Sequence, residues 1–267
     1  MNPSTAAIVA GLIGLIGVAL STWANVRIKR TDIRAAREVE SLKAALTEAK
    51  EIRAEGRSKR MQAEATISRY REPLLGAAFD LQARVFNIRR GGFFYSDTSS
   101  YHIDHTLYVF GQYLGWREII RQEIQFMDLG DIPATRELAE QLERITHSLS
   151  SSDPSLSSEF KIFRGEQRAM GEKMMTPAGP QCRCLGYTEF VESLSHEEFA
   201  NWFAKLRGSV EGLRSSRTAD FSRLALLQNA LIDLIDGLDP EAVRFPAYLR
   251  KRMPMSPKVA DLYDRQR

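Results

Sequence analysis

The chain of 267 residues is 43% hydrophobic and 27% charged, which is typical of a globular protein and excludes a disordered chain as the default. The net charge of +3 is uneven, because residues 1–69 carry 12 basic and 7 acidic side chains, whereas residues 70–267 carry 25 and 27. A dedicated nucleic-acid binder gathers its positive charge on the folded domain, so this distribution argues against nucleic acid as a partner.

The first predicted element is an apolar run at residues 6–24, AAIVAGLIGLIGVALSTWA, which contains no charged residue. As a helix it would be about 28 Å long, which matches the hydrocarbon thickness of a bilayer. A cleaved signal peptide needs positive charges before its apolar run, whereas here Arg27, Lys29 and Arg30 follow it. The sequence therefore predicts a retained single-pass transmembrane helix in the plasma (inner) membrane, with the N-terminus outside and the soluble domain cytoplasmic.

The next segment, residues 25–69, is predicted to be a charged helical stalk, because it is rich in Ala, Glu, Lys and Arg and lacks proline. Apolar residues from Val39 to Ala49 follow the spacing of a coiled-coil seam. The same register then places arginines and a glycine on the seam between residues 53 and 60. Two interpretations remain open: a broken coiled coil with a second copy of the chain, and a solvated single helix.

Residues 70–240 are predicted to form an all-α domain, an irregular bundle of five or six helices, because apolar residues recur every three or four positions. No segment shows a convincing strand pattern. The serine-rich run at residues 148–158 is typical of a flexible connection. The predicted helices lie at residues 73–90, 101–128, 135–147 and 160–175, from Ser195 onward, and at 218–236. A short helix at residues 187–194 is expected to lead into the one that begins at Ser195.

The last segment, residues 241–267, is a basic–aromatic tail in which Phe245, Tyr248 and Leu249 precede a basic triplet at residues 250–252. Such a stretch can bind lipid, protein or nucleic acid. More often, a tail of this kind docks on its own domain.

The densest polar motif is FKIFRGEQRAMGEKM at residues 160–174, in which Arg164 and Arg168 lie one turn apart with Glu166 between them. Paired arginines can clamp a phosphate or a carboxylate, so these three residues are the candidate ligand-binding site. The alternative, which we favour, is an internal salt-bridge network with acidic side chains elsewhere in the domain.

Two further groups have the residue types of a metal or redox site, but each lacks the ligand number and spacing that such sites require. They are His102, Asp104 and His105, and Cys182, Cys184 and His196. We therefore predict no metal site and no cofactor. The chain also lacks a P-loop, G-x-S-x-G, H-E-x-x-H and the kinase signatures, which argues against an enzyme.

Three strings resemble a group of bacterial single-pass membrane-anchored helical proteins. They are RYREPLLGAAFDLQARVFNI at residues 69–88, YVFGQYLGWREIIRQEIQFMDLG at 108–130 and FKIFRGEQRAM at 160–170. That group has no assigned activity, so the resemblance implies a bacterial source and a membrane anchor but no catalytic residue, substrate or cofactor.

Together these features predict a membrane-tethered helical interaction or scaffold module that contacts the bilayer and either a protein partner or a second copy of itself. Two alternatives remain. The first is a ligand sensor or enzyme that uses Arg164, Glu166 and Arg168 between helices. The second is a membrane-tethered nucleic-acid binder, which the slightly acidic domain makes the weaker one.

Overall fold

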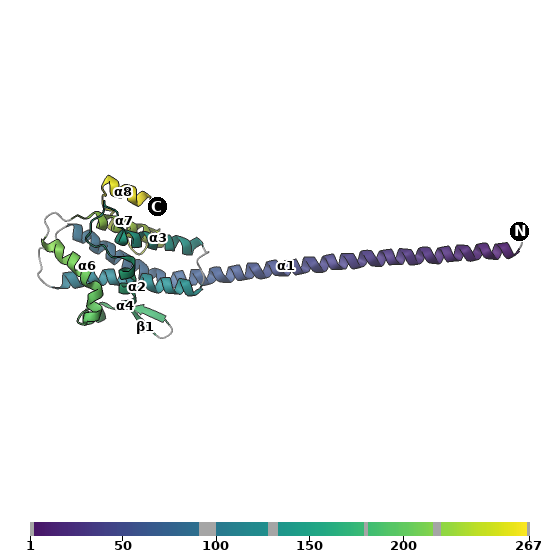
Figure 1. Ribbon diagram of the computed structural model, residues 1–267, viewed down its shortest axis with the longest axis horizontal. Coiled ribbons are helices and arrows are strands. Elements are labelled where there is room, and N and C mark those ends of the chain that lie inside the picture. Colours follow the sequence, from purple (N-terminus) through teal and green to yellow (C-terminus); the bar gives the residue numbers. More distant parts are fainter. Residues whose placement is uncertain (1–2, 91–99, 128–132, 179–180, 216–219, 266–267) are drawn as a thin grey trace. The chain divides into compact units, whose positions relative to one another are not determined.

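The computed structural model describes the backbone of residues 3–90, 100–127, 133–178, 181–215 and 220–265. It is mostly helical (Figure 1), which confirms the predicted all-α class. The chain divides into two compact units, Met1–Arg60 and Met61–Arg267.

The elements follow one another in chain order with the labels of Figure 1. They are α1 (Pro3–Arg90), α2 (Tyr101–Met127), α3 (Pro133–Ser150), α4 (Arg164–Lys173), β1 (Met175–Ala178), β2 (Gln181–Cys184), α5 (Tyr187–Ser193), α6 (Glu197–Ser215), α7 (Ser222–Leu238), the 3-10 turn η1 (Ala247–Leu249) and α8 (Pro257–Asp264).

The first unit consists of the N-terminal part of α1. Among the residues whose side chains the structure describes, no helix combines the length and the apolar character needed to cross a bilayer. The side chains of residues 6–16, the larger part of the predicted anchor, lie outside those residues. The candidate coiled-coil residues Val39, Leu42 and Leu46 are exposed. The structure therefore does not support the predicted span, and of the two interpretations of the stalk it does not support the coiled coil.

Helix α1 continues through Pro73, where the sequence predicted a separate helix to begin. That prediction of a new start is wrong. A proline inside a helix removes one backbone hydrogen bond and costs about 3 kcal/mol. The neighbouring side chains of Tyr70, Leu74 and Leu75 are all buried in the core, and their burial offsets this cost.

The core of the second unit forms where the apolar faces of the helices meet. The inward face of α1 contributes residues from Tyr70 to Ile88, and α7 is buried almost all round. Helix α2 packs on α4, α5, α6 and β2, while α7 packs on α3 and α8. Because α7 has neighbours on several sides, its sequence is apolar beyond a single stripe.

Two differences from the predicted architecture concern segments without helical periodicity. Strands β1 and β2 form an antiparallel hairpin that the sequence did not predict, in which Met175 pairs with Cys184 and Pro177 with Cys182. The run at residues 148–158 is packed rather than flexible, because Leu156 and Ser157 are buried. Its backbone carbonyls accept hydrogen bonds from Arg223, a residue far away in the sequence.

The close approach of α2 and α4 depends on glycine. A Cβ atom added at Gly171 would lie 2.7 Å from the carbonyl oxygen of Leu114 and 3.0 Å from Cβ of Glu118. Real Cβ atoms do not approach a backbone oxygen so closely, so the two helices would have to separate.

We therefore expect Gly171→Ala to lower the free energy of unfolding by about 1–3 kcal/mol, as overpacking of a core does. Urea unfolding followed by circular dichroism measures this change. Gly165→Ala on the same helix is the matched control, because a Cβ atom there meets nothing within 4 Å. That variant is expected to be neutral or slightly stabilising, since alanine is the better helix former. Equal losses from both substitutions would contradict the packing explanation.

Candidate functional site

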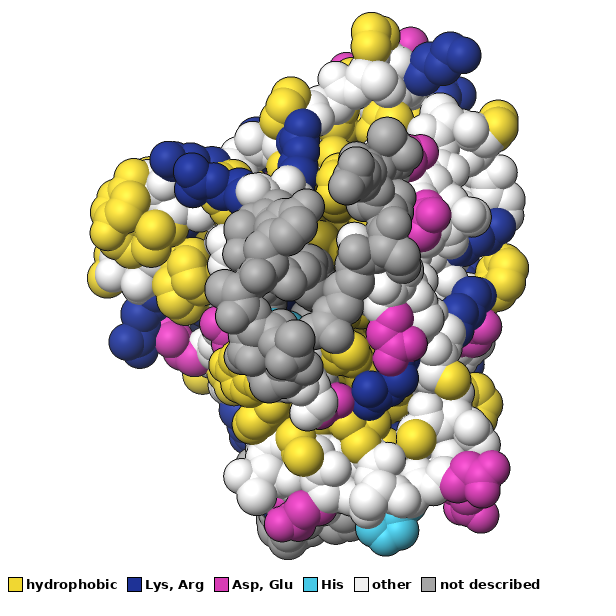
Figure 2. Space-filling model, turned by 90° about the vertical axis from the view of Figure 1, so that its left-hand side faces the viewer, with side chains coloured by type: hydrophobic (Ala, Val, Ile, Leu, Met, Phe, Trp, Pro, Cys, Tyr) yellow, Lys and Arg dark blue, Asp and Glu magenta, His cyan; other side chains and the backbone are white. Residues whose placement is uncertain are grey.

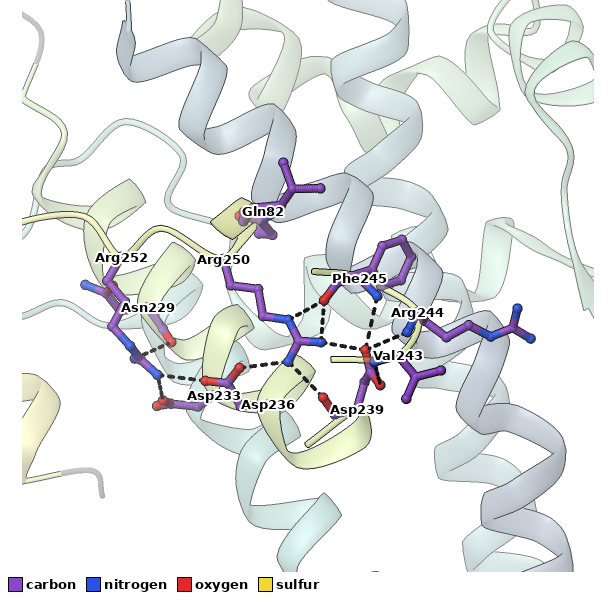
Figure 3. A network of polar contacts seen from close by, with 11 residues as sticks. Gln82, Asn229, Asp233, Asp236, Asp239, Val243, Arg244, Phe245, Arg250 and Arg252 are labelled. Atoms are coloured by element: carbon purple, nitrogen blue, oxygen red, sulfur yellow. Dashed lines mark hydrogen bonds and ion pairs between the residues drawn. The ribbon is translucent and has the colours of Figure 1, made fainter. Parts of the chain in front are cut away.

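The C-terminal tail is held on α7 by the polar network in Figure 3. The side chain of Arg250 is only 5% exposed. Its guanidinium donates to the carboxylates of Asp236, at 3.0 Å, and Asp239, at 2.5 Å, and to the carbonyl oxygen of Phe245. A buried arginine needs such partners, because an unpaired charge in the interior is strongly unfavourable.

Asp239 organises the turn that follows α7. Its carboxylate accepts backbone hydrogen bonds from Val243, at 2.9 Å, and from Arg244 and Phe245, both at 3.1 Å. Burial disfavours the ionised form of Asp239, but these three N–H groups and the Arg250 guanidinium outweigh it and lower the pKa below its usual value. The turn is therefore closed around an ionised aspartate.

A second arginine continues the network along α7. Arg252 donates to Asp233 at 2.7 Å, to Asp236 at 3.2 Å and to the hydroxyl of Tyr263 at 2.8 Å. Tyr263 in turn donates to the other oxygen of Asp233. These contacts confirm that the basic–aromatic tail docks on its own domain.

Docking of the tail creates a groove of about 380 Å³ between the tail and the last turns of α1. The residues that line it come from one stripe of α1 and from the segment around η1. They are Phe79, Gln82, Ala83, Phe86, Asn87, Arg90, Tyr248, Leu249 and Lys251.

The groove is apolar and aromatic. Phe79 stacks on Phe245 of the tail, with ring centroids 3.8 Å apart. Beside it, Tyr248 is 70% and Leu249 43% exposed, so large apolar surface faces solvent next to the hollow. Exposed apolar patches that lie beside a hollow are typical of binding sites rather than of inert surface.

The charged side chains among the described residues of the groove are both positive. Arg90 lies over the ring of Phe86, 5.5 Å from its centroid, and Lys251 lines the opposite wall. Within the described residues neither cation forms an ion pair, whereas Arg250, Arg252 and Arg244 all do. No acidic side chain is among the described residues that line the groove. The groove therefore carries two cations whose charge no carboxylate of the described chain balances.

A buried amide lies at the base of the groove. Gln82 is 2% exposed and donates to the carbonyl oxygen of Leu249 at 3.4 Å. It also accepts from Gln228 at 3.5 Å. Both distances are at the long limit of hydrogen bonding, so these bonds are weak.

The predicted ligand residues Arg164, Glu166 and Arg168 lie on the outer side of α4. Arg164 forms an exposed ion pair with Glu143, and Glu166 accepts from Lys205 at 3.0 Å. Arg168 is exposed, and its positive charge is one of the causes that lower the pKa of Glu118. None of the three lines the groove, so their role in binding a ligand stays a prediction.

The histidine group at the start of α2 lies in an aromatic cluster. Arg84 donates to Nδ1 of His105, whose ring stacks on Tyr101 with centroids 5.3 Å apart. Burial, Arg84 and His102 lower the pKa of His105 to about 4, so its ring is neutral at pH 7. Asp104 instead pairs with Arg207 at 3.0 Å. The described residues contain no cluster of three or more His, Cys, Asp or Glu side chains arranged for a metal ion.

The two cysteines lie on β2 rather than in a loop, and both are free thiols. Burial raises the pKa of Cys184 to about 12, so it is a thiol rather than a thiolate at neutral pH. Its sulfur lies 3.8 Å from the carbonyl oxygen of Gln112. This environment is that of a packed residue rather than of a nucleophile.

The sequence-based prediction included one wall of the groove, the tail with Tyr248 and Leu249, but missed the α1 wall. One signal could have revealed it: Phe79 and Phe86 lie off the stripe that forms the core face of α1. A second apolar stripe on a helix indicates a second contact.

Comparisons of the chain with protein-family models, with curated proteins and with solved structures found no match.

Proposed function

We propose that the protein is a membrane-tethered interaction module that binds a protein partner in the groove between α1 and the tail. The observation that carries this proposal is the combination of exposed apolar side chains with two cations, Arg90 and Lys251, that form no ion pair with any described residue. Aromatic side chains and arginine are the residues that contribute most to protein–protein binding.

The contacts that hold the two walls of the groove support a binding role. The Arg250 network fixes the tail wall, and α1 provides the other wall as a regular helix. A preformed groove binds more tightly than a flexible one, because less conformational entropy is lost on binding.

The distribution of charge favours a protein over a nucleic acid. Arg250 and Arg252 are held by carboxylates of α7 and by Asp239 just after it, which leaves Lys251 as the cation of the triplet that lines the groove. On the face shown in Figure 2, the described basic and acidic side chains are interspersed rather than gathered by sign. Binding to a nucleic acid needs a field of one sign that covers many phosphates, whereas the groove provides two cations.

The tether is proposed from the sequence. The apolar run at residues 6–24 and the basic residues from Arg27 onward favour a single span with the domain on the cytoplasmic side.

One experiment tests the tether and the binding site together. The chain is expressed in cells of the organism from which it comes, with a photoreactive phenylalanine analogue at position 248. The cells are irradiated, and their membranes are isolated and washed with alkaline carbonate. We expect a discrete crosslinked product that contains a second polypeptide and stays in the membrane fraction. Mass spectrometry identifies that polypeptide.

The matched control places the same analogue at Trp202, which is also exposed but does not line the groove. The product is expected to be absent or different there. An identical product from both positions, or none from position 248, would contradict binding in the groove. A product released by carbonate would contradict the tether.

A further inference from the structure

The partner of the groove is defined by the shape and the charge of its lining. We infer that the groove binds an amphipathic helix of a partner protein whose apolar face is flanked by acidic residues. This inference rests on the proposed function and adds the chemistry of the partner to it.

The shape of the groove matches a helix. Its α1 residues are spaced 3, 1, 3, 1 and 3 positions apart from Phe79 to Arg90, so they form one straight stripe along the helix. This stripe is about 16 Å long, at 1.5 Å per residue. A partner helix of about three turns can lie along such a stripe and against the tail wall, as in other helix-in-groove complexes.

The apolar part of the lining determines the inner face of that helix. Phe79, Phe86 and Leu249 provide surface for side chains repeated every three or four residues. Gln82, which is buried beneath them, bonds to Leu249 and Gln228 within the domain. Burial of the apolar side chains contributes binding free energy that does not depend on the charge of the partner.

The charges of the groove determine which residues flank the apolar face of the partner helix. Arg90 comes from the last turn of α1 and Lys251 from the tail, so the two cations lie on opposite walls of the groove. A helix with carboxylates beside its apolar face would pair with both, while a basic helix would be repelled by both. A neutral helix would leave two cations partly desolvated without partners, which is unfavourable.

The test is a selection from a displayed library of helix-forming peptides of about 16 residues, long enough to span the groove. Residues are randomised without any bias in charge, and the target is the full-length protein in detergent micelles. We expect the selected peptides to combine an apolar stripe with several Asp or Glu residues beside it. Fluorescence anisotropy then measures the affinity of the selected peptides.

Two variants assign the binding to the groove and to its charge. The double variant Arg90→Glu/Lys251→Glu is expected to weaken binding of the selected peptides by at least about tenfold. Its matched control is Lys258→Glu/Arg265→Glu, which makes the same change in net charge at a separate hollow lined by Asp153 and Asp261. The control is expected to leave the affinity within about twofold.

A third variant, Leu249→Asp, separates this inference from the proposed function. If the selected peptides lack acidic residues and bind the double charge-reversal variant normally but bind Leu249→Asp weakly, the inference of an acidic partner is overturned. The proposed function would still stand in that case. Peptides that tolerate all the groove variants would overturn both. Binding to phosphatidylglycerol vesicles that depends on Arg90 and Lys251, with no peptide selected, would identify a lipid surface and overturn the inference.

Discussion

Replacing Arg223 with methionine is expected to lower the free energy of unfolding by about 4 kcal/mol, or to prevent folding altogether. Arg223 is only 1% exposed. Its guanidinium donates to four backbone carbonyl oxygens: Ser148 at 2.7 Å, Leu149 at 3.2 Å, Ser151 at 2.9 Å and Ser157 at 2.8 Å. Methionine fills a similar volume but donates no hydrogen bond, so all four buried carbonyls would lose this donor.

The charge of Arg223 does not complicate this expectation. Burial lowers its pKa to about 10, which still leaves the guanidinium protonated at pH 7. Three of its four acceptors belong to the C-terminal end of α3 or to the residue just after it, where carbonyls lack partners within the helix. Arg223 therefore caps α3 from a different helix.

Urea unfolding followed by circular dichroism measures the loss. Arg168→Met is the matched control, because Arg168 is exposed on α4, and it is expected to change stability by less than about 0.5 kcal/mol. Arg223→Lys keeps the charge but has fewer donors, so an intermediate loss is expected. Similar stabilities for Arg223→Met and Arg168→Met would show that the four hydrogen bonds contribute little.

The second large effect is expected for Arg250→Met, which removes one partner of a buried ion pair. Such a change costs about 3–5 kcal/mol, because the carboxylate of Asp239 stays buried without its cation. The tail from residue 241 onward is expected to detach from α7 at a lower cost than global unfolding. Hydrogen exchange measured by mass spectrometry should therefore show that the substitution accelerates exchange more in the tail than in α2.

Arg244→Met is the control for this prediction. Arg244 also lies in the tail, but its ion pair with Glu72 is more than half exposed on both sides. Exposed pairs contribute about 0–1 kcal/mol, so little change in tail exchange is expected. If Arg250→Met leaves the tail protected, the network in Figure 3 does not hold it.

Elements with a helical repeat of apolar residues could be predicted closely from the sequence. The second domain helix was expected at residues 101–128 and is observed as Tyr101–Met127, and the short helix expected at 187–194 is observed as Tyr187–Ser193. Both carry their signal locally, in the spacing of side chains and the residues that end them.

Segments that depend on distant partners could not be predicted in this way. The run at residues 148–158 looks like a flexible linker, and it is packed because Arg223, 66 residues after Ser157, donates to it. The hairpin strands have four residues each, too few to show alternation. The groove likewise depends on two segments that are 167 residues apart at Gln82 and Leu249.

That separation links binding and stability thermodynamically. Because one wall of the groove belongs to α1 and the other to the tail, a partner that contacts both walls binds only the form in which the tail is docked. A ligand at a concentration one hundred times its Kd would then stabilise the docked form by about 2.7 kcal/mol. Conversely, any modification or substitution that loosens the tail would lower the affinity for such a partner without contacting it.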